Sequence, residues 1–213
     1  MVIGKIEYLN LLPFHVFMKR FTSSSQQKMS MEYYRGVPAQ INKKFISKRV
    51  DAAFISSISA KKYRNVGLGI IAKKEVMSVI VVPSAKDEVD CESASSNVLA
   101  NILNIPGKVL IGDKALKYTL SSCEYVDLAE EWHRKYKLPF VFALLCFHKD
   151  AKLYTSIEKQ FLKQKIKIPQ YILEKASRKT KIEKNEIKNY LNYISYALDT
   201  KAKLGLKKFY SLT

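Results

Sequence analysis

The chain has 213 residues, of which 47% are hydrophobic, and it carries a formal net charge of +18 at pH 7. This hydrophobic content is ordinary for a globular protein and excludes a chain that is disordered throughout. The apolar runs, such as those at 79–83 and 140–147, are far too short to span a bilayer, so we expect one domain or two small lobes with a buried core.

The positive charge is spread along the chain rather than gathered in one basic arm. Lysines cluster at 43–44, 61–62, 73–74, 159–167 and 207–208. Such a surplus is typical of proteins that bind nucleic acid, anionic membranes or small anions, but no RNA-binding aromatic motif accompanies it. We therefore predict no nucleic-acid and no membrane partner. We interpret most of the lysines as residues of solvated faces, which support an anionic ligand only weakly.

The first third of the chain alternates segments of strand character with segments of helix character. We predict strands over 2–8, 31–34 and 51–55, a polar connection over 23–27 and a helix over 14–21. A further helix starts at Pro38, because proline suits the first helical turn, and its apolar face comprises Ile41, Phe45 and Ile46. Another helix opens at Ser56.

The middle of the chain continues this alternation. Strands are predicted over 77–83, 109–112 and 140–145, and a helix over 95–103. A second helix begins at Asp127, which stands three residues before Glu130 as in a capping box, and Pro139 ends it.

After residue 148 the pattern is predominantly helical. Thr180 and Glu183 again have the spacing of a capping box. We predict that they start one long helix, which ends at Gly205 and buries a stripe formed by Ile187, Leu191, Ile194 and Leu198.

Strands that alternate with helices predict an α/β fold with largely parallel pairing. If the strands at 77–83 and 140–147 are both crossovers, the middle of the chain forms its own lobe and the two chain ends build the other. We predict lobe one over 1–79 plus 146–213 and lobe two over 80–145. This split is the topology of the type II periplasmic-binding-protein fold, with a ligand cleft between the lobes.

The three cysteines, Cys91, Cys123 and Cys146, and the three histidines lie far apart and offer no zinc-ligand spacing. We expect incidental or buried thiols and no metal, although the sequence leaves a catalytic Cys–His pair open. The N-terminus begins at once with residues of a folded strand and lacks the regions of a signal peptide, so we expect a cytoplasmic protein.

Six blocks form an ordered series along the chain. They are GKIEYLNLLP at 4–13, VP through DAAFIS at 37–56, SVIV at 78–81, SASSNVL at 93–99, LIGDKAL at 110–116 and DLAEEWHRKYKLPFVFA at 127–143. In this order they resemble the chorismate dehydratase family of the futalosine route to menaquinone. The segment 190–209 also resembles the closing helix of that family, so the resemblance covers nearly the whole chain.

The resemblance implies a hydro-lyase that converts chorismate to 3-[(1-carboxyvinyl)oxy]benzoate and water, without a cofactor, as a monomer or homodimer. Aromatisation drives such a reaction, so the enzyme has mainly to orient the substrate, assist the leaving hydroxyl and exclude water. The alternative is a cytoplasmic binding protein of the same fold, which holds a small anionic metabolite without turnover.

The resemblance also implies catalytic roles for Asn10 and Ser78. Asn10 follows the first strand, where its amide can donate and accept hydrogen bonds, and a turn-stabilising asparagine is the equal alternative. Ser78 belongs to an apolar strand and needs a hydrogen-bond partner if it is buried. We predict that the two residues face one ligand from opposite walls near the hinge.

Five further residues are predicted to bind the substrate, namely Ser56, Ser95, Ser96, Asp113 and Phe140. The three serines and the aspartate stand where a strand ends or a helix begins, so helix capping explains them equally well. Phe140 opens the apolar strand of the PFVFA segment.

Overall fold

The computed structural model describes residues 1–22, 24–26, 29, 34–122 and 124–213. The predicted strand 31–34 and the predicted connection 23–27 lie partly outside the described residues, and Cys123 lies outside them. In chain order the elements are β1 (Lys5–Ile6), the 3-10 helix η1 (Leu9–Leu11), α1 (Leu12–Phe21), β2 (Arg35–Gly36), α3 (Pro38–Ile46), β3 (Ala52–Ser56), α4 (Ser57–Ala60), β4 (Asn65–Ala72), β5 (Val79–Val82), α5 (Ala94–Leu103), β6 (Lys108–Ile111), α6 (Gly112–Thr119), β7 (Val126–Asp127), α7 (Leu128–Tyr136), β8 (Phe140–Phe147), α8 (Ala151–Lys163), α9 (Gln170–Thr180), α10 (Lys184–Leu191), β9 (Ile194–Ala197) and α11 (Thr200–Ser211).

The strands form a four-stranded sheet of order β3-β8-β4-β9, a three-stranded sheet of order β6-β5-β7 and a parallel pair of β1 with β2. The expectation of largely parallel pairing is wrong, because every neighbouring pair in the two larger sheets is antiparallel. In the larger sheet the reason is that β8 enters from the other lobe and runs against both of its neighbours. An isolated parallel bridge between Ile3 and Ala52 places the N-terminal segment beside β3.

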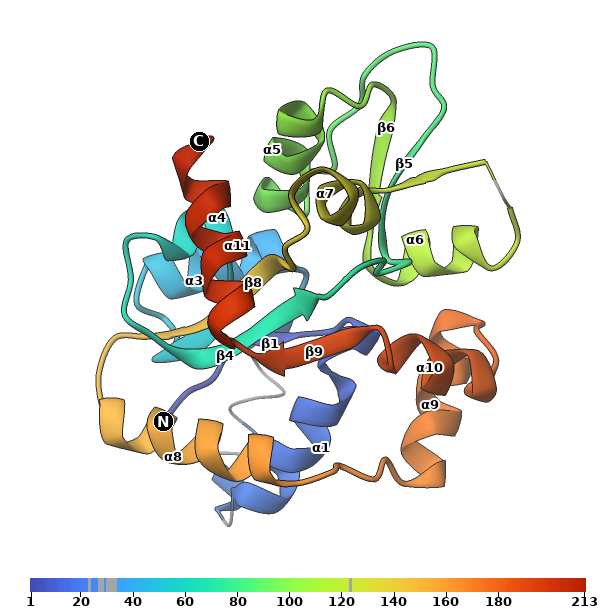
Figure 1. Ribbon diagram of the computed structural model, residues 1–213. Coiled ribbons are helices and arrows are strands. Elements are labelled where there is room, and N and C mark those ends of the chain that lie inside the picture. The colour runs from blue at the N-terminus through green and yellow to red at the C-terminus, as the bar shows by residue number, and fades with distance from the viewer. Residues whose placement is uncertain (23, 27–28, 30–33, 123) are drawn as a thin grey trace.

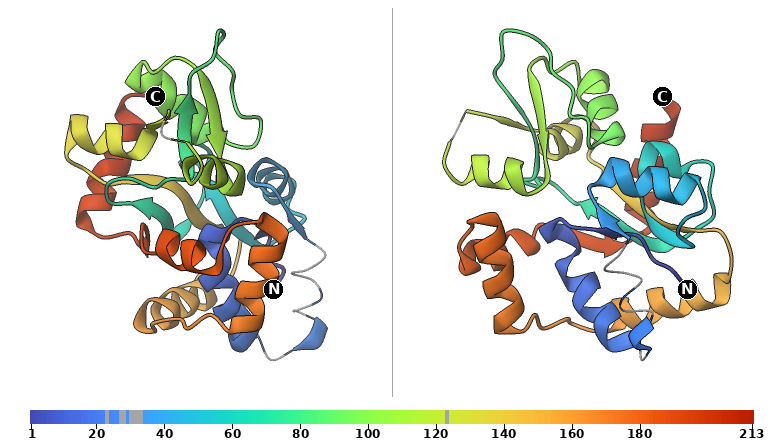
Figure 2. Two further views of the ribbon diagram at one scale, coloured as in Figure 1. Left: turned by 90° about the vertical axis from the view of Figure 1, so that its right-hand side faces the viewer. Right: turned by 180° about the vertical axis from the view of Figure 1, so that it is seen from behind.

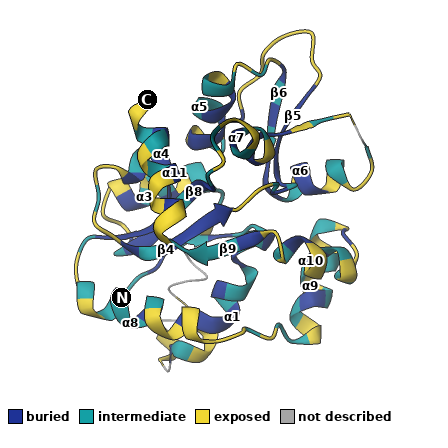
Figure 3. Ribbon diagram, in the orientation of Figure 1, coloured by how far each residue is buried: buried dark blue, intermediate teal, exposed yellow. Residues whose placement is uncertain are grey.

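Two lobes are built on the two larger sheets (Figure 1). In the large lobe, α1 and α8 lie on one side of the four-stranded sheet and α3, α4 and α11 on the other, as the views of Figure 2 also show. In the small lobe, α5, α6 and α7 pack against the three-stranded sheet. Figure 3 shows that the buried residues concentrate in the strands and on the inner faces of the helices.

The chain passes between the lobes twice, from β4 to β5 and from α7 back to β8 (Figure 1). Because β8 pairs with β3 and β4 from Phe140 to Phe147, the predicted boundary at 145/146 would divide a strand of the larger sheet. We propose instead that the large lobe comprises 1–78 plus 140–213 and the small lobe 79–136, with 137–139 as the connection.

Two of the three local start signals were predicted correctly. The third is wrong, because Thr180 ends α9 and its hydroxyl donates to the carbonyl oxygen of Ala176 instead of capping a helix. Pro38 stands in the first turn of α3, and Ile41 and Phe45 are fully buried. Ile46, at the end of that helix, is 53% exposed, so its predicted place on the buried face is wrong. Asp127 caps α7 by accepting hydrogen bonds from the backbone N–H groups of Ala129 and Glu130.

The predicted long C-terminal helix is wrong. Its residues form α10, the edge strand β9 and α11, since Ile194 begins a strand that pairs with β4. Gly205 does not end a helix but lies within α11, where an added Cβ would stand 2.1 Å from the carbonyl oxygen of Pro139. The glycine therefore allows α11 to lie directly against the chain that enters β8.

Candidate active site

A cavity that is partly open to solvent lies between the lobes. Residues of η1, β3 and β8 form its wall on the large lobe, and residues of α5, β6 and α6 form the wall on the small lobe. Residues of the crossover between β4 and β5 line the cavity where these walls meet. Of the seven predicted site residues, the wall contains four: Asn10, Ser56, Ser78 and Ser96. Most of the remaining wall is apolar, including Ile6, Leu11, Phe54, Ile70, Val76 and Phe142.

Asn10 presents an unsatisfied acceptor to this cavity. It lies in the 3-10 helix η1, and its side-chain oxygen Oδ1 is buried without a hydrogen-bond partner within the part of the chain that the structure describes. A buried amide oxygen that has lost its water costs free energy until a donor reaches it. Asn10 Oδ1 is therefore positioned to accept a hydrogen bond from a ligand in the cavity.

Ser78 lies at the end of the crossover into β5, and only 1% of it is exposed. Its Oγ accepts a hydrogen bond of 2.8 Å from the phenol of Tyr190. Its backbone oxygen accepts one from the N–H of Gly112, also at 2.8 Å. Among the described residues the Ser78 hydroxyl hydrogen has no acceptor, so it is available to a molecule in the cavity.

Ser56 and Ser96 reach the cavity from the starts of two helices. Ser56 Oγ accepts a hydrogen bond from the side chain of Asn42 and donates one to Ser59 Oγ. Ser96 Oγ pairs with Ser93 Oγ at 2.7 Å, and Ser93 is the residue that caps α5. The predicted capping at this helix therefore falls on Ser93.

Ser95, Asp113 and Phe140 are not among the residues that line the cavity. Ser95 Oγ bonds to Ser57 Oγ and accepts from the N–H of Ile58, so it joins the two lobes. Asp113 accepts from the N–H of Leu9 at 3.0 Å and also joins them. Phe140 is fully buried and packs against the rings of Trp132 and Phe209, with centroids 5.2 and 5.0 Å away.

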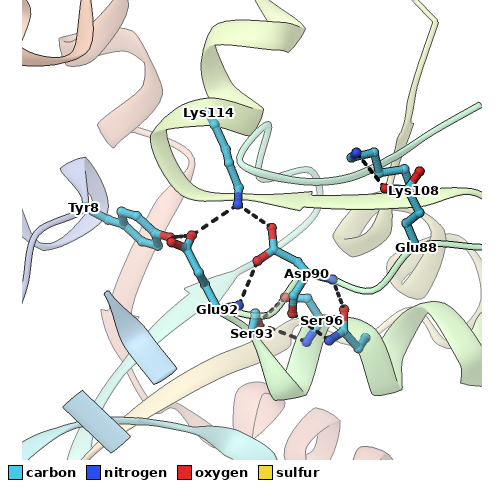
Figure 4. A network of polar contacts seen from close by, with 9 residues as sticks. Tyr8, Glu88, Asp90, Glu92, Ser93, Ser96, Lys108 and Lys114 are labelled. Carbon is cyan, nitrogen blue, oxygen red and sulfur yellow. Dashed lines mark hydrogen bonds and ion pairs between the residues drawn. The ribbon is translucent and has the colours of Figure 1, made fainter. Parts of the chain in front are cut away.

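A polar network that was not predicted from the sequence lies beside the cavity (Figure 4). Tyr8 donates a hydrogen bond to Glu92, and Lys114 bridges Glu92 and the buried Asp90 at 3.2 and 2.8 Å. Burial and the carboxylate of Glu92 raise the pKa of Tyr8, so the phenol stays protonated and donating. In the sequence, Tyr8 stands out only as a member of the block at 4–13. Glu92 lies 84 positions further along the chain, so no local pattern indicated it as the partner of Tyr8.

The ring of Tyr8 lies over Gly112, which also lines the cavity. A Cβ at Gly112 would stand 2.5 Å from the ring, and its φ of +67° favours glycine. The glycine thus lets a ring of the large lobe contact the start of α6 in the small lobe.

Within the described residues, no group of three or more His, Cys, Asp and Glu side chains is arranged to hold a metal ion. The same residues include no helix with both the length and the apolar character needed to cross a membrane.

The two lobes with a cavity between them have the fold of the periplasmic binding proteins. Over 99% of its length the chain is similar to a crystal structure from Archaeoglobus fulgidus, with a TM-score of 0.69, 12% identity and 95% of that chain covered. A Candida albicans protein, described as having the generic periplasmic binding protein fold, matches with a TM-score of 0.50 and 12% identity, covering 99% of this chain and 90% of that one.

The sequence comparison narrows this class. The family model for menaquinone biosynthesis matches residues 1–106 and 100–213. A protein named chorismate dehydratase from Campylobacter jejuni is 46% identical over 98% of this chain and 96% of its own length. The chain belongs to the menaquinone biosynthesis family.

Proposed function

We propose that this protein is a chorismate dehydratase, a hydro-lyase that converts chorismate to 3-[(1-carboxyvinyl)oxy]benzoate and water in menaquinone biosynthesis. The family match and the relative from Campylobacter jejuni support the reaction. The observation that carries the proposal is the pairing of Asn10 and Ser78 in one cavity, the first with an unsatisfied acceptor and the second with an available donor.

These two groups match what the reaction requires. Chorismate loses its ring hydroxyl and a ring hydrogen as water, and the ring becomes aromatic. The ring hydrogen leaves as a proton and, with the departing hydroxyl, makes up the water. Ser78 would donate a hydrogen bond to the oxygen of the departing hydroxyl, where negative charge develops, and Asn10 Oδ1 would accept a hydrogen bond from the same hydroxyl and so orient it. A neutral donor held in place before the reaction stabilises the developing charge without reorganising.

The apolar wall of the cavity suits the ring and excludes water from it. We assign the substrate carboxylates to the polar wall near Ser56 and Ser96, where α5 begins and the backbone N–H groups of a helix start favour anions. In this proposal Ser95, Asp113 and Phe140 support the walls and do not touch the substrate. The oligomeric state, monomer or homodimer, and the cytoplasmic location stay predictions from the sequence.

Incubation of the purified protein with chorismate, followed by chromatography of the products, tests the proposal. We expect an aromatic product in amounts proportional to enzyme and time. A protein that binds chorismate or another anion saturably, but leaves chorismate unchanged, would instead be a binding protein of this fold.

A further inference from the structure

We infer that Tyr190 and Tyr196 are positioning residues, which hold Ser78 and Asn10 in the geometry that the reaction needs. The inference rests on the proposed function and adds to it two residues that do not line the cavity. Both come from the C-terminal segment of α10 and β9, far along the chain from the groups they hold.

Tyr190 determines the direction in which Ser78 can donate. The phenol donates to Ser78 Oγ over 2.8 Å, and both residues are buried, at 2% and 1% exposure. The hydroxyl group of Tyr190 has a single hydrogen, and this bond uses it. The bond also occupies one lone pair of the serine oxygen. The serine hydrogen must then point elsewhere, and the cavity is the side on which Ser78 lacks an acceptor among the described residues.

Tyr196 acts in the same way on the other wall. Its phenol donates to the backbone carbonyl oxygen of Asn10 over 2.6 Å. That carbonyl belongs to η1, a 3-10 turn whose other support includes the bond from the Leu9 N–H to Asp113. Fixing the backbone of Asn10 fixes the point from which its unsatisfied Oδ1 extends into the cavity.

Both phenols stay protonated over the working range of pH. Burial raises the pKa of Tyr190, and burial together with the neighbouring Tyr190 raises the pKa of Tyr196. The two phenols therefore keep the hydrogens that they donate in these bonds. Small displacements of positioned groups cost much of their effect on rate, which is why supports of this kind matter.

A pair of double-mutant cycles tests the inference. Tyr190→Phe is measured alone and with Ser78→Ala, and Tyr196→Phe alone and with Asn10→Ala, each by steady-state conversion of chorismate. Each Tyr→Phe change keeps the ring and removes only the hydroxyl. Tyr154→Phe is the matched control, because Tyr154 is a buried tyrosine that stacks on Phe147 and does not line the cavity.

We expect each single Tyr→Phe variant to lower kcat about tenfold or more, with KM within about threefold of wild type. In the Ser78→Ala or Asn10→Ala background, the same change should lower kcat by less than about twofold, since the positioned group is gone. Tyr154→Phe should keep wild-type kcat. The melting temperature of every variant is measured to identify any that fails to fold. If a variant of one double-mutant cycle fails to fold, the remaining cycle tests the inference.

An equal loss of kcat in both backgrounds, or no loss in either single variant, overturns the inference while the proposed function stands. A wild-type protein that neither binds nor converts chorismate overturns the proposed function and this inference with it.

Discussion

Tyr8 donates a hydrogen bond of 2.5 Å to Glu92 and so connects the large lobe to the small lobe beside the cavity. Lys114 contacts the same carboxylate from the side of α6, so Glu92 is held by residues of both lobes (Figure 4). Together with the contacts of Ser95 and Asp113, this bond favours the closed arrangement of the lobes.

Tyr8→Phe should therefore weaken closure rather than chemistry. The ring still packs on Gly112, but the bond between the lobes is lost. We expect KM for chorismate to rise about three- to tenfold, because a smaller fraction of the protein is in the closed state, and kcat to change less.

Glu88→Gln is the control for this change, since the ion pair of Glu88 with Lys108 lies within the small lobe. Steady-state kinetics on both variants makes the comparison. A fall in kcat at constant KM in Tyr8→Phe would show that Tyr8 acts in the chemical step instead.

Asn10→Ala and Ser78→Ala should each lower kcat about a hundredfold or more, because each removes one hydrogen bond to the reacting groups in a closed site. Thermal unfolding of Asn10→Ala should stay within about 4 °C of wild type, because Oδ1 of Asn10 has no partner to lose. Ser78→Ala leaves the buried phenol of Tyr190 without its acceptor, so its melting temperature should fall further than that of Asn10→Ala. Ser121→Ala, in the exposed turn that follows α6, is the control. Near-full activity of both variants would remove these residues from the active site.

The carboxyl group of Asp113 should make stability depend on pH. Burial raises its pKa from 3.8 to about 6, although the bond from Leu9 and the charge of Lys179 act to lower it. From about pH 4 to about pH 6 the folded protein keeps a proton that the unfolded chain has lost, so this group makes the free energy of unfolding fall as pH rises.

Asp113→Asn removes this titration and keeps an oxygen that can accept from the N–H of Leu9. We expect the melting temperature of Asp113→Asn, relative to that of wild type, to increase between about pH 4 and about pH 7. A difference that is constant over this range would contradict the assignment of the titration to Asp113.

Asp127 should be one of the most important carboxylates for stability. One oxygen accepts from the N–H groups of Val76 and Met77 in the first crossover, and the other caps α7 at Ala129 and Glu130. Asp127→Ala leaves several buried donors unsatisfied, and we expect a loss of about 3 kcal/mol in the free energy of unfolding.

Asp199→Ala is the matched control, because Asp199 caps α11 through one N–H, that of Ala202. It should cost only about 1 kcal/mol. Chemical denaturation of both variants measures the two values, and equal losses would mean that Asp127 is no more than a helix cap.

The sequence predicted those features that depend on neighbouring residues. Pro38 and Asp127 begin helices through contacts within a few positions, and both were placed correctly. Ile194 was misplaced because its spacing from Ile187 and Leu191 also suits a helix, and only the partner β4, distant in the chain, makes it a strand.

The site shows the same limit. The resemblance supplied Asn10 and Ser78, which lie together in the cavity, but no local pattern could indicate the phenols that hold them. The bond from Tyr190 to Ser78 spans 112 positions in the chain, and that from Tyr196 to Asn10 spans 186. Asp113 was predicted to bind the substrate because it follows a strand. It lies near the junction of the lobes, as that position suggested, but its carboxylate accepts a hydrogen bond from Leu9 and does not line the cavity.

The strand order also bears on how the protein is made. The three-stranded sheet uses one continuous stretch of chain, which is complete once β7 has left the ribosome. The four-stranded sheet pairs Ala52 with Phe147 and Ala72 with Ile194, so its early strands must wait until residues 140–197 have been made. During synthesis the small lobe can fold first, while β3 and β4 stay unpaired and exposed to aggregation until the C-terminal segment arrives.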